Sequence, residues 1–135
     1  MRYSIEKCPF FHDERGDIIQ FVTRQMLKKN RLEFGQIYIV TFDGKNVVRG
    51  NHFHNHSMEI FFVMSGVVEI VLEDVRTKER FQQVFDASKS EFFRITLSEK
   101  IAHAIRSISD YAMVIGFSSK EYNPQEDDKI SYKLI

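Results

Sequence analysis

Residues able to bind metals or transfer protons are concentrated between His52 and Gly66, in the segment HFHNHSMEIFFVMSG. His52 and His54 are two residues apart, so on a β-strand both imidazoles project to the same face. Glu59 can return to them from the adjoining strand. Imidazole and carboxylate groups are ligands for zinc, nickel and iron, and imidazole also transfers protons near neutral pH. The spacing therefore predicts a metal site or an acid–base site.

Two further histidines bear on this site. His103 lies in a later strand candidate, and a closed barrel would bring it across as a fourth ligand. His56 continues the alternation of His52 and His54, so it is either another member of the site or an exposed loop residue. The alternative is that all of these are ordinary surface or pocket residues. A shared pocket is favoured because histidine and glutamate seldom lie in apolar strands without partners.

The elements that must position these residues are expected to be strands. Apolar stretches recur every 8 to 12 residues or so with turn signals between them, such as Asp43-Gly44 and Ser65-Gly66, which is typical of a sandwich or barrel. Residues 24–32 are expected to be a short helical turn or a loop, and residues 130–135 an edge strand or a docked tail. The predicted strands are 18–22, 36–42, 47–54, 59–64, 67–73, 81–85, 92–97, 101–108 and 111–118.

Composition supports a small all-β domain. The 135 residues, 43% of them hydrophobic, suffice for one core, so residues 1–135 are expected to form a single domain. Thirteen phenylalanines and five tyrosines favour strands.

Nineteen basic residues balance nineteen acidic ones, which argues against nucleic acid or anionic membranes as partners. The longest apolar run, Ile60 to Met64, is too short to span a membrane, and the single Cys8 points to the cytoplasm.

The pattern His-x-His, four residues, Glu, six residues, Gly resembles the first cupin motif, and His103 resembles the metal ligand of the second. The resemblance spans about Gln36 to Ser118 and implies a double-stranded β-helix, or jelly-roll barrel. Within the cupins, the chain resembles RmlC-like proteins that rearrange nucleotide-activated sugars in bacterial surface-polysaccharide synthesis. The segments that carry this second resemblance are DERGD, QIYIV, VVRGNHFH and SSKEYNPQEDD.

Two branches of these cupins are relevant. The TDP-4-keto-6-deoxyglucose 3,4-ketoisomerases share DERG, the tyrosine at position 38 and the motif Arg-Gly-x-His-x-His that begins at Arg49. They usually have Gln at position 59 and Lys at position 55. The cupin domain of capsular polysaccharide reductase-epimerases resembles RGNHFHN, keeps the glutamate and holds zinc. The expected function is therefore isomerisation or epimerisation of a TDP- or UDP-4-keto-6-deoxy-hexose.

Such a reaction needs a base beside the ketone, a group that stabilises the enediolate oxygen, and an acid. The ketoisomerase resemblance implies His52 or His54 as the base. Tyr38 is either an acid or hydrogen-bond donor or an ordinary wall residue. Arg49, with Asn51, is expected to contact the substrate, where the guanidinium would bind the pyrophosphate; the alternative for Arg49 is a salt bridge at the rim. If a divalent metal is bound at His52, His54, Glu59 and His103, the histidines become ligands, and His56 or Tyr38 carries the proton. Zinc is favoured over nickel or iron, and no organic cofactor is expected.

Two other functions stay open from the sequence. Three histidines and a glutamate also support a metal-dependent oxygenase or another small-molecule cupin enzyme, which would bind iron and consume oxygen. A non-catalytic sugar-binding cupin would bind the nucleotide sugar and leave it unchanged. The aromatic-rich strands are expected to supply the interface of a homodimer.

Overall fold

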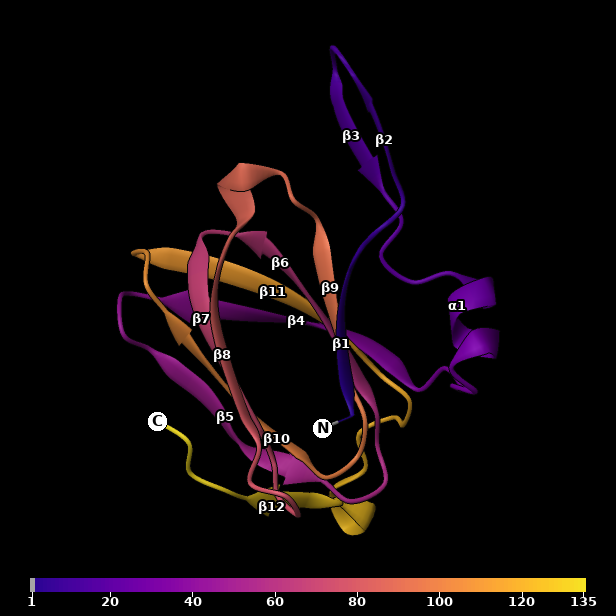
Figure 1. The fold of residues 1–135 in the computed structure, drawn as a ribbon, viewed down its shortest axis with the longest axis vertical. Helices are drawn as coiled ribbons and strands as arrows, with labels where there is room; N and C mark the ends of the chain where they lie inside the picture. Colours follow the sequence, from indigo (N-terminus) through magenta and orange to yellow (C-terminus); the bar gives the residue numbers. More distant parts are fainter. Residues whose placement is uncertain (1) are drawn as a thin grey trace.

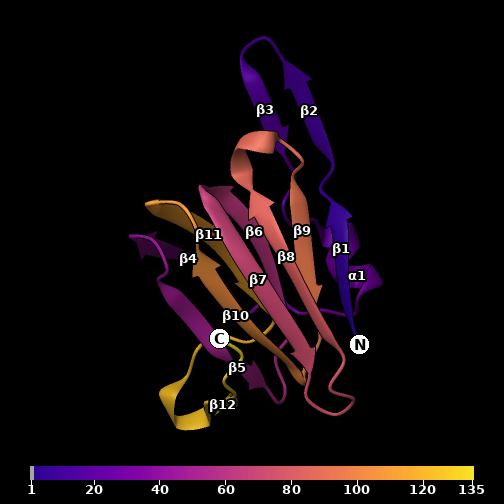
Figure 2. The same ribbon diagram turned by 60° about the vertical axis from the view of Figure 1, so that its left-hand side comes forward.

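The computed structural model describes residues 2–135, whose strands form two facing antiparallel sheets (Figure 1; Figure 2). In spatial order, the first sheet contains β1 (Tyr3–Lys7), β9 (Phe93–Leu97), β6 (Glu59–Ser65), β11 (Tyr111–Ser118) and β4 (Gln36–Asp43). The second contains β12 (Lys129–Ser131), β5 (Val48–His54), β10 (Ile101–Ser107), β7 (Val67–Asp74) and β8 (Arg80–Asp86). This arrangement confirms the predicted all-β jelly-roll barrel.

The main core fills the space between the two sheets. On β7, Val68, Ile70 and Leu72 are fully buried, as expected when alternate residues of a strand face the same side. Their partners from the other sheet include Phe42 of β4 and Val114 of β11. The core of the barrel is thus built from the inward-facing side chains of both sheets.

The turn between β6 and β7 joins the two sheets at Gly66. Its φ of +78° lies in the left-handed region, and a Cβ there would stand 2.2 Å from the Tyr111 carbonyl oxygen. Only glycine fits such a turn without displacing the neighbouring backbone. The predicted turn at Ser65-Gly66 is confirmed.

The N-terminal part adds a hairpin and a helix outside the barrel. Strands β2 (Phe10–Asp13) and β3 (Gly16–Ile19) pair only with each other and project beyond the sheets (Figure 1; Figure 2). The strand predicted for residues 18–22 ends at Ile19, because Phe21 and Val22 pack instead against the cluster beneath the helix. The hairpin β2–β3 therefore has no buried side chains.

Residues 24–32 begin with the helix α1 (Arg24–Lys29), which Thr23 caps by accepting a hydrogen bond from Met26 N at 3.2 Å. Two single-turn 3₁₀ helices, η1 (Ala87–Lys89) and η2 (Pro124–Glu126), interrupt the loops. None of the helices within residues 2–135 is long and apolar enough to cross a membrane.

Candidate active site

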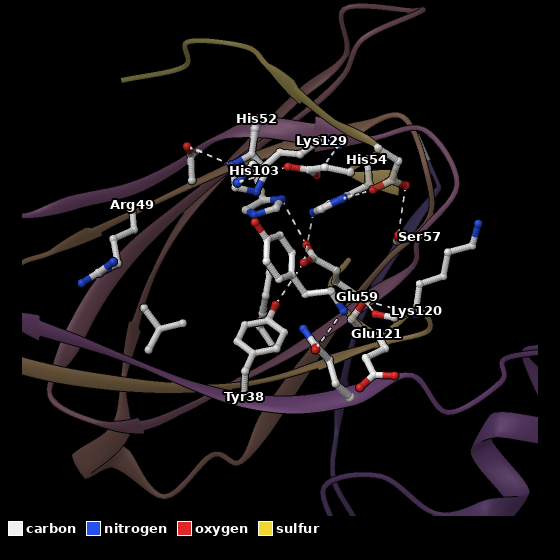
Figure 3. Close-up of a pocket in the computed structure, with 18 of the residues that line it drawn as sticks. Tyr38, Arg49, His52, His54, Ser57, Glu59, His103, Lys120, Glu121 and Lys129 are labelled. Atoms are coloured by element: carbon white, nitrogen blue, oxygen red, sulfur yellow. Dashed lines mark hydrogen bonds and ion pairs between the residues drawn. The ribbon is translucent and has the colours of Figure 1, made fainter. Parts of the chain in front are cut away.

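Three strands bring the predicted site residues together inside the barrel (Figure 3). His52 and His54 project from β5, Glu59 begins β6, and His103 of β10 is the register partner of His52. The ring centroids of His52 and His103 are 4.6 Å apart, and those of His52 and His54 are 5.2 Å apart. These residues line a cavity of about 780 Å³, which is within the usual range for small-molecule sites.

A glycine makes the close contact between β5 and β10 possible. Gly50 has a φ of +93°, and a Cβ at this position would lie 2.7 Å from the carbonyl oxygen of His103. The register of the two strands shifts between His103 and Ala104, which is the irregularity of a β-bulge. Gly50 therefore lets the two histidine-bearing strands approach each other at the cavity.

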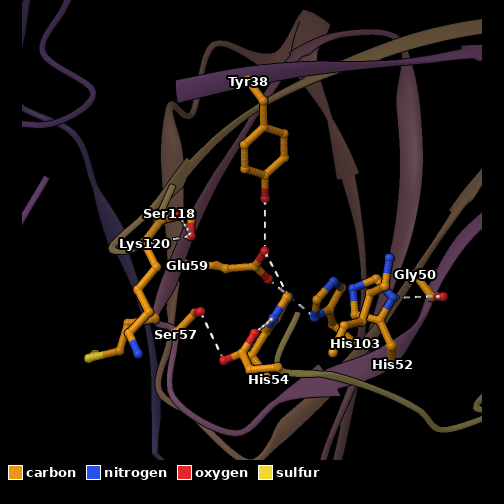
Figure 4. A network of polar contacts seen from close by, with 12 residues as sticks. Tyr38, Gly50, His52, His54, Ser57, Glu59, His103, Ser118 and Lys120 are labelled. Carbon is orange, nitrogen blue, oxygen red and sulfur yellow. Dashed lines mark hydrogen bonds and ion pairs between the residues drawn. The ribbon is translucent and has the colours of Figure 1, made fainter. Parts of the chain in front are cut away.

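Glu59 is the central acceptor of the site (Figure 4). Its buried carboxylate accepts a hydrogen bond from the Tyr38 hydroxyl at 3.0 Å and lies 3.3 Å from Nε2 of His54. The second carboxylate oxygen is 3.5 Å from Nδ1 of His103. Burial would raise the pKa of Glu59, but the hydrogen bond and charge of His54 and the hydrogen bond from the Tyr38 hydroxyl lower it. Glu59 is therefore ionised at neutral pH.

His54 lies between two carboxylates. Its Nδ1 is 2.8 Å from Oδ1 of Asp128, while its Nε2 faces Glu59. Burial would lower the pKa of His54, but its hydrogen bond and charge interaction with Glu59, followed by those with Asp128, raise it to about 9. Because a carboxylate only accepts hydrogen bonds, both ring nitrogens carry protons, and His54 is an imidazolium at neutral pH.

Asp128 is the functional residue that the sequence analysis missed. Besides His54, its carboxylate accepts hydrogen bonds from the backbone N–H of His56 at 2.8 Å and from the Ser57 hydroxyl at 3.0 Å. These donors lower its pKa to about 2 although burial acts in the opposite direction. Asp128 stands in a polar run, NPQEDD, that has the composition of a solvated loop. No local pattern relates it to a histidine 74 positions earlier.

His52 lines the cavity, and its Nε2 has no hydrogen-bond partner among residues 2–135. Its Nδ1 lies 3.1 Å from the carbonyl oxygen of Gly50, so Nδ1 carries the proton and Nε2 is unprotonated. Burial lowers the pKa of His52 to about 4. His52 is therefore a neutral imidazole throughout the physiological range.

His103 is also uncharged. It is buried, its ring packs against Phe61 at a centroid distance of 5.1 Å, and its Nδ1 makes no hydrogen bond within residues 2–135. Burial lowers the pKa of His103. Of the two histidines beside Glu59, the protonated one is thus His54, which has two carboxylate partners, and His103 is neutral.

The same hydrogen bonds bear on metal binding. Both nitrogens of His54 are turned toward carboxylates, and Glu59 already accepts from Tyr38 and His54. A metal would need lone pairs from these groups aimed at one point. Within residues 2–135, no three His, Cys, Asp or Glu side chains have such an arrangement. The side chains as placed do not fit a metal ion, and the metal site stays a prediction.

The remaining predicted residues fall into two groups. Tyr38, Arg49 and His56 line the cavity. The side chain of Asn51 does not line it, because it is hydrogen-bonded to backbone atoms of Leu134 and Ile135. The side chain of Asn51 is thus directed away from the cavity, and its contact with substrate stays a prediction.

Arg49 lies apart from the histidines, at the opposite side of the cavity from Lys120 (Figure 3). Its Nε donates to the Thr41 carbonyl oxygen at 3.0 Å, and its guanidinium carbon lies 5.9 Å from the Phe42 ring centroid. Lys120 and Lys129 are exposed lining residues and add positive charge. Three cationic side chains thus surround a cavity whose centre holds an ion pair.

The protein is similar in sequence to proteins of polysaccharide synthesis. Residues 11–130 match the family described as the polysaccharide biosynthesis C-terminal domain. The spore coat polysaccharide biosynthesis protein SpsL of Bacillus subtilis (strain 168) is 24% identical over 132 residues, which cover 93% of this chain and 84% of SpsL.

Solved structures share the fold at low identity. A 3,4-ketoisomerase from Helicobacter canadensis has a TM-score of 0.80 at 24% identity, over 97% of this chain and 91% of that one. A dTDP-4-dehydrorhamnose 3,5-epimerase from Bacillus anthracis has a TM-score of 0.83 at 16% identity, over 96% and 78%. The fold is thus that of the RmlC-like cupins. Since the family match spans residues 11–130, the chain belongs to the polysaccharide biosynthesis C-terminal domain family.

Proposed function

We propose that the protein is a nucleotide-sugar isomerase or epimerase. It acts on a TDP- or UDP-4-keto-6-deoxy-hexose by removing a proton next to the ketone, in bacterial surface-polysaccharide synthesis. The observation that carries this proposal is one cavity that holds a neutral histidine with a free Nε2 and a tyrosine hydroxyl, His52 and Tyr38. The similar structures described as ketoisomerases and epimerases, and the polysaccharide biosynthesis relative, support it.

His52 is the base of the proposed reaction. Its Nε2 takes the hydrogen from the carbon beside the ketone, and the electron pair of that C–H bond moves into an enediolate. Since the Nδ1–H of His52 is held by the Gly50 carbonyl, the ring keeps the tautomer that this step needs. The low pKa keeps His52 unprotonated at neutral pH, so the base is available before substrate binds.

Tyr38 is the donor in this scheme. Its hydroxyl can stabilise the developing oxyanion and return a proton to the enediolate. Burial, then the charge of Glu59, raises the pKa of Tyr38, so the hydroxyl stays protonated until it donates. The His54 imidazolium adds a fixed positive charge close by, and Glu59 and Asp128 hold it in place.

In this proposal, the cationic side chains at the edge of the cavity bind the diphosphate group of the nucleoside diphosphate sugar. Arg49 uses only Nε on the Thr41 carbonyl, which leaves its terminal nitrogens for phosphate oxygens. Lys120 and Lys129 can supply further contacts. No step of this proposal passes through a metal ion, and the histidines act in proton transfer and charge stabilisation.

Solvent deuterium exchange tests the proposal. The protein is incubated in D₂O with TDP- and UDP-4-keto-6-deoxyglucose, and ¹H NMR follows the ring hydrogens. Loss of the signal beside the ketone, with wild-type protein and not with His52→Asn, is the expected result. Absence of exchange with both nucleotides would refute the proposal. Binding without exchange would identify a sugar-binding cupin instead.

We also propose that the protein is a cytoplasmic homodimer. The hairpin β2–β3 exposes Phe11 (59%) and Ile18 (68%), and the outer face of the first sheet exposes Ile39 (60%). Apolar side chains exposed together usually mark an interface, and two-fold symmetry would let each hairpin cover the other copy's sheet. A nucleotide-sugar substrate and the free thiol of Cys8 support the cytoplasm.

Sedimentation equilibrium tests the dimer. Wild-type protein is expected at twice the monomer mass, and Phe11→Ser with Ile39→Lys at the monomer mass with an unchanged far-UV circular dichroism spectrum. A wild-type monomer at micromolar concentration would contradict this assignment and leave the enzymatic proposal untouched.

A further inference from the structure

Asn51 lies between the cavity residues Gly50 and His52, yet its side chain lies on the opposite face of β5. Its backbone has a φ of +56°, a left-handed conformation that asparagine and glycine tolerate better than other residues. Its Oδ1 accepts hydrogen bonds from the N–H groups of Leu134 at 2.8 Å and Ile135 at 3.2 Å. Its Nδ2 donates to the Ile135 carbonyl oxygen at 3.2 Å.

These bonds hold the segment Asp128–Ile135, which we call the C-terminal strap. The strap pairs with β5 through its three-residue strand β12, with Lys129 opposite His54 and Ser131 opposite His52. The backbone N–H of Tyr132 also donates to the Asn51 carbonyl oxygen at 2.8 Å. Asn51 therefore makes four hydrogen bonds to three residues of the strap, Tyr132, Leu134 and Ile135.

An apolar contact secures the same end of the strap. Leu134 is buried against Val71, Ala102 and Ala104 on the outer side of the second sheet. Arg80 donates to the Leu134 carbonyl oxygen at 3.0 Å. The far end of the strap is thus fixed to the sheet by both packing and hydrogen bonds.

The near end of the strap is Asp128, which orients His54. The seven residues that precede Asp128, Glu121–Asp127, are all exposed, so little apolar packing holds it from that side. A three-residue strand at a sheet edge is prone to fraying unless its end is tied down. Asp128 is itself bonded to the backbone N–H groups of Asn55 and His56 and to the Ser57 hydroxyl. The anchored half of the strap is the support on its other side, at the carboxylate that lies 2.8 Å from Nδ1 of His54.

We propose that Asn51 is a positioning residue for the active site, which acts through the C-terminal strap on Asp128 and so fixes the ring of His54. This inference names a role for Asn51 that does not involve contact with substrate. Its consequence for activity rests on the proposed function, while its consequence for His54 does not.

Two substitutions at Asn51 separate its side-chain hydrogen bonds from its backbone conformation. Asn51→Gly keeps the left-handed φ and removes all three side-chain bonds. Asn51→Asp keeps the oxygen that accepts from Leu134 and Ile135. The matched control is Asn46→Gly, an exposed asparagine with a φ of +60° outside the cavity. Leu134→Ala loosens the same end of the strap without touching β5.

The first measurement is NMR of the His54 ring, which needs no substrate. In wild-type protein labelled with ¹⁵N, the Nδ1–H bonded to Asp128 gives a slowly exchanging, downfield signal, assigned by its loss in His54→Gln. The signal is expected to persist in Asn46→Gly and Asn51→Asp and to be lost in Asn51→Gly and Leu134→Ala. A signal that persists in folded Asn51→Gly overturns the inference. Should Asn51→Gly fail to fold, persistence in Leu134→Ala does so.

The second measurement is kcat of deuterium exchange. Asn51→Gly is expected to lower kcat by about tenfold, since small misplacements of catalytic groups cost one to two orders of magnitude. KM is expected to change by less than about twofold, because the phosphate contacts are untouched. Asn51→Asp is expected to restore most of the rate. A rise in KM alone would overturn the positioning role. No exchange by wild-type protein would refute the proposed function and leave the NMR result standing.

Discussion

The hydroxyl of Tyr38 donates a hydrogen bond of 3.0 Å to the buried carboxylate of Glu59. Tyr38 lies on the edge strand β4 and Glu59 on β6, so this bond crosses the intervening strand β11 on the inner face of the sheet. It holds the proposed donor beside the ion pair that Glu59 forms with His54. The position of Tyr38 and the charge state of the site are thus coupled through one carboxylate (Figure 4).

Tyr38→Phe is expected to lower the exchange rate by about 100-fold or more, the usual contribution of a general acid. Stability is expected to fall by only about 1 kcal/mol, because Glu59 keeps His54 as a partner. Exchange kinetics and urea denaturation measure the two effects. A rate within a factor of about three of wild type would show that Tyr38 is not the donor.

Gly116→Ala is expected to displace the same tyrosine without removing its hydroxyl. A Cβ at Gly116 would stand 2.4 Å from Cζ of Tyr38, and the contacts are with the ring, which must move away from Glu59. The predicted result is a loss of rate comparable to that of Tyr38→Phe, with a far-UV circular dichroism spectrum like that of wild type. Full activity of Gly116→Ala would mean that the ring position tolerates such a shift.

The free energy of unfolding is expected to be greatest near pH 6.5. His54 has a folded-state pKa raised to about 9, so its contribution is fully present below about pH 6.5 and is lost as the pH rises through 9. One group over this interval corresponds to about 3 kcal/mol. His52, whose pKa is lowered to about 4, has the opposite effect: unfolding gains protons below pH 6.5, so stability falls as the pH decreases.

Urea denaturation between pH 5 and 9.5 checks this profile. Asp128→Asn removes one of the two carboxylates that raise the pKa of His54, so its alkaline loss of stability should begin at lower pH and be smaller. Wild-type stability that stays constant from pH 6.5 to 9.5 would contradict the assignment of the buried proton to His54.

Chelation is expected to leave deuterium exchange unchanged. In the observed arrangement both nitrogens of His54 serve carboxylates, and the proposed base and donor do not need a metal. Protein dialysed against EDTA is compared with protein reconstituted with zinc, and elemental analysis gives the metal content of each. Stoichiometric zinc together with activity lost on dialysis and regained on reconstitution would support the predicted ligands His52, His54, Glu59 and His103 instead.

Much of the site was predictable because it is encoded locally. The alternation of His52 and His54 and the spacing to Glu59 depend on the two-residue period of strands. The turn at Gly66 is visible in the sequence because left-handed backbone favours glycine. Strand boundaries from Gln36 onward followed from apolar runs between turn residues. These features need no knowledge of which strand lies beside which.

Only the tertiary structure decided how the groups are partnered. Asp128 reaches His54 because β12 pairs with β5, a register that joins segments some 74 positions apart and that loop composition does not encode. Asn51 turns away from the cavity because its left-handed backbone, next to the β-bulge, breaks the alternation expected of a regular strand. The local sequence thus determines which chemical groups are available. The protonation of each group depends on contacts that exist only once the barrel has closed.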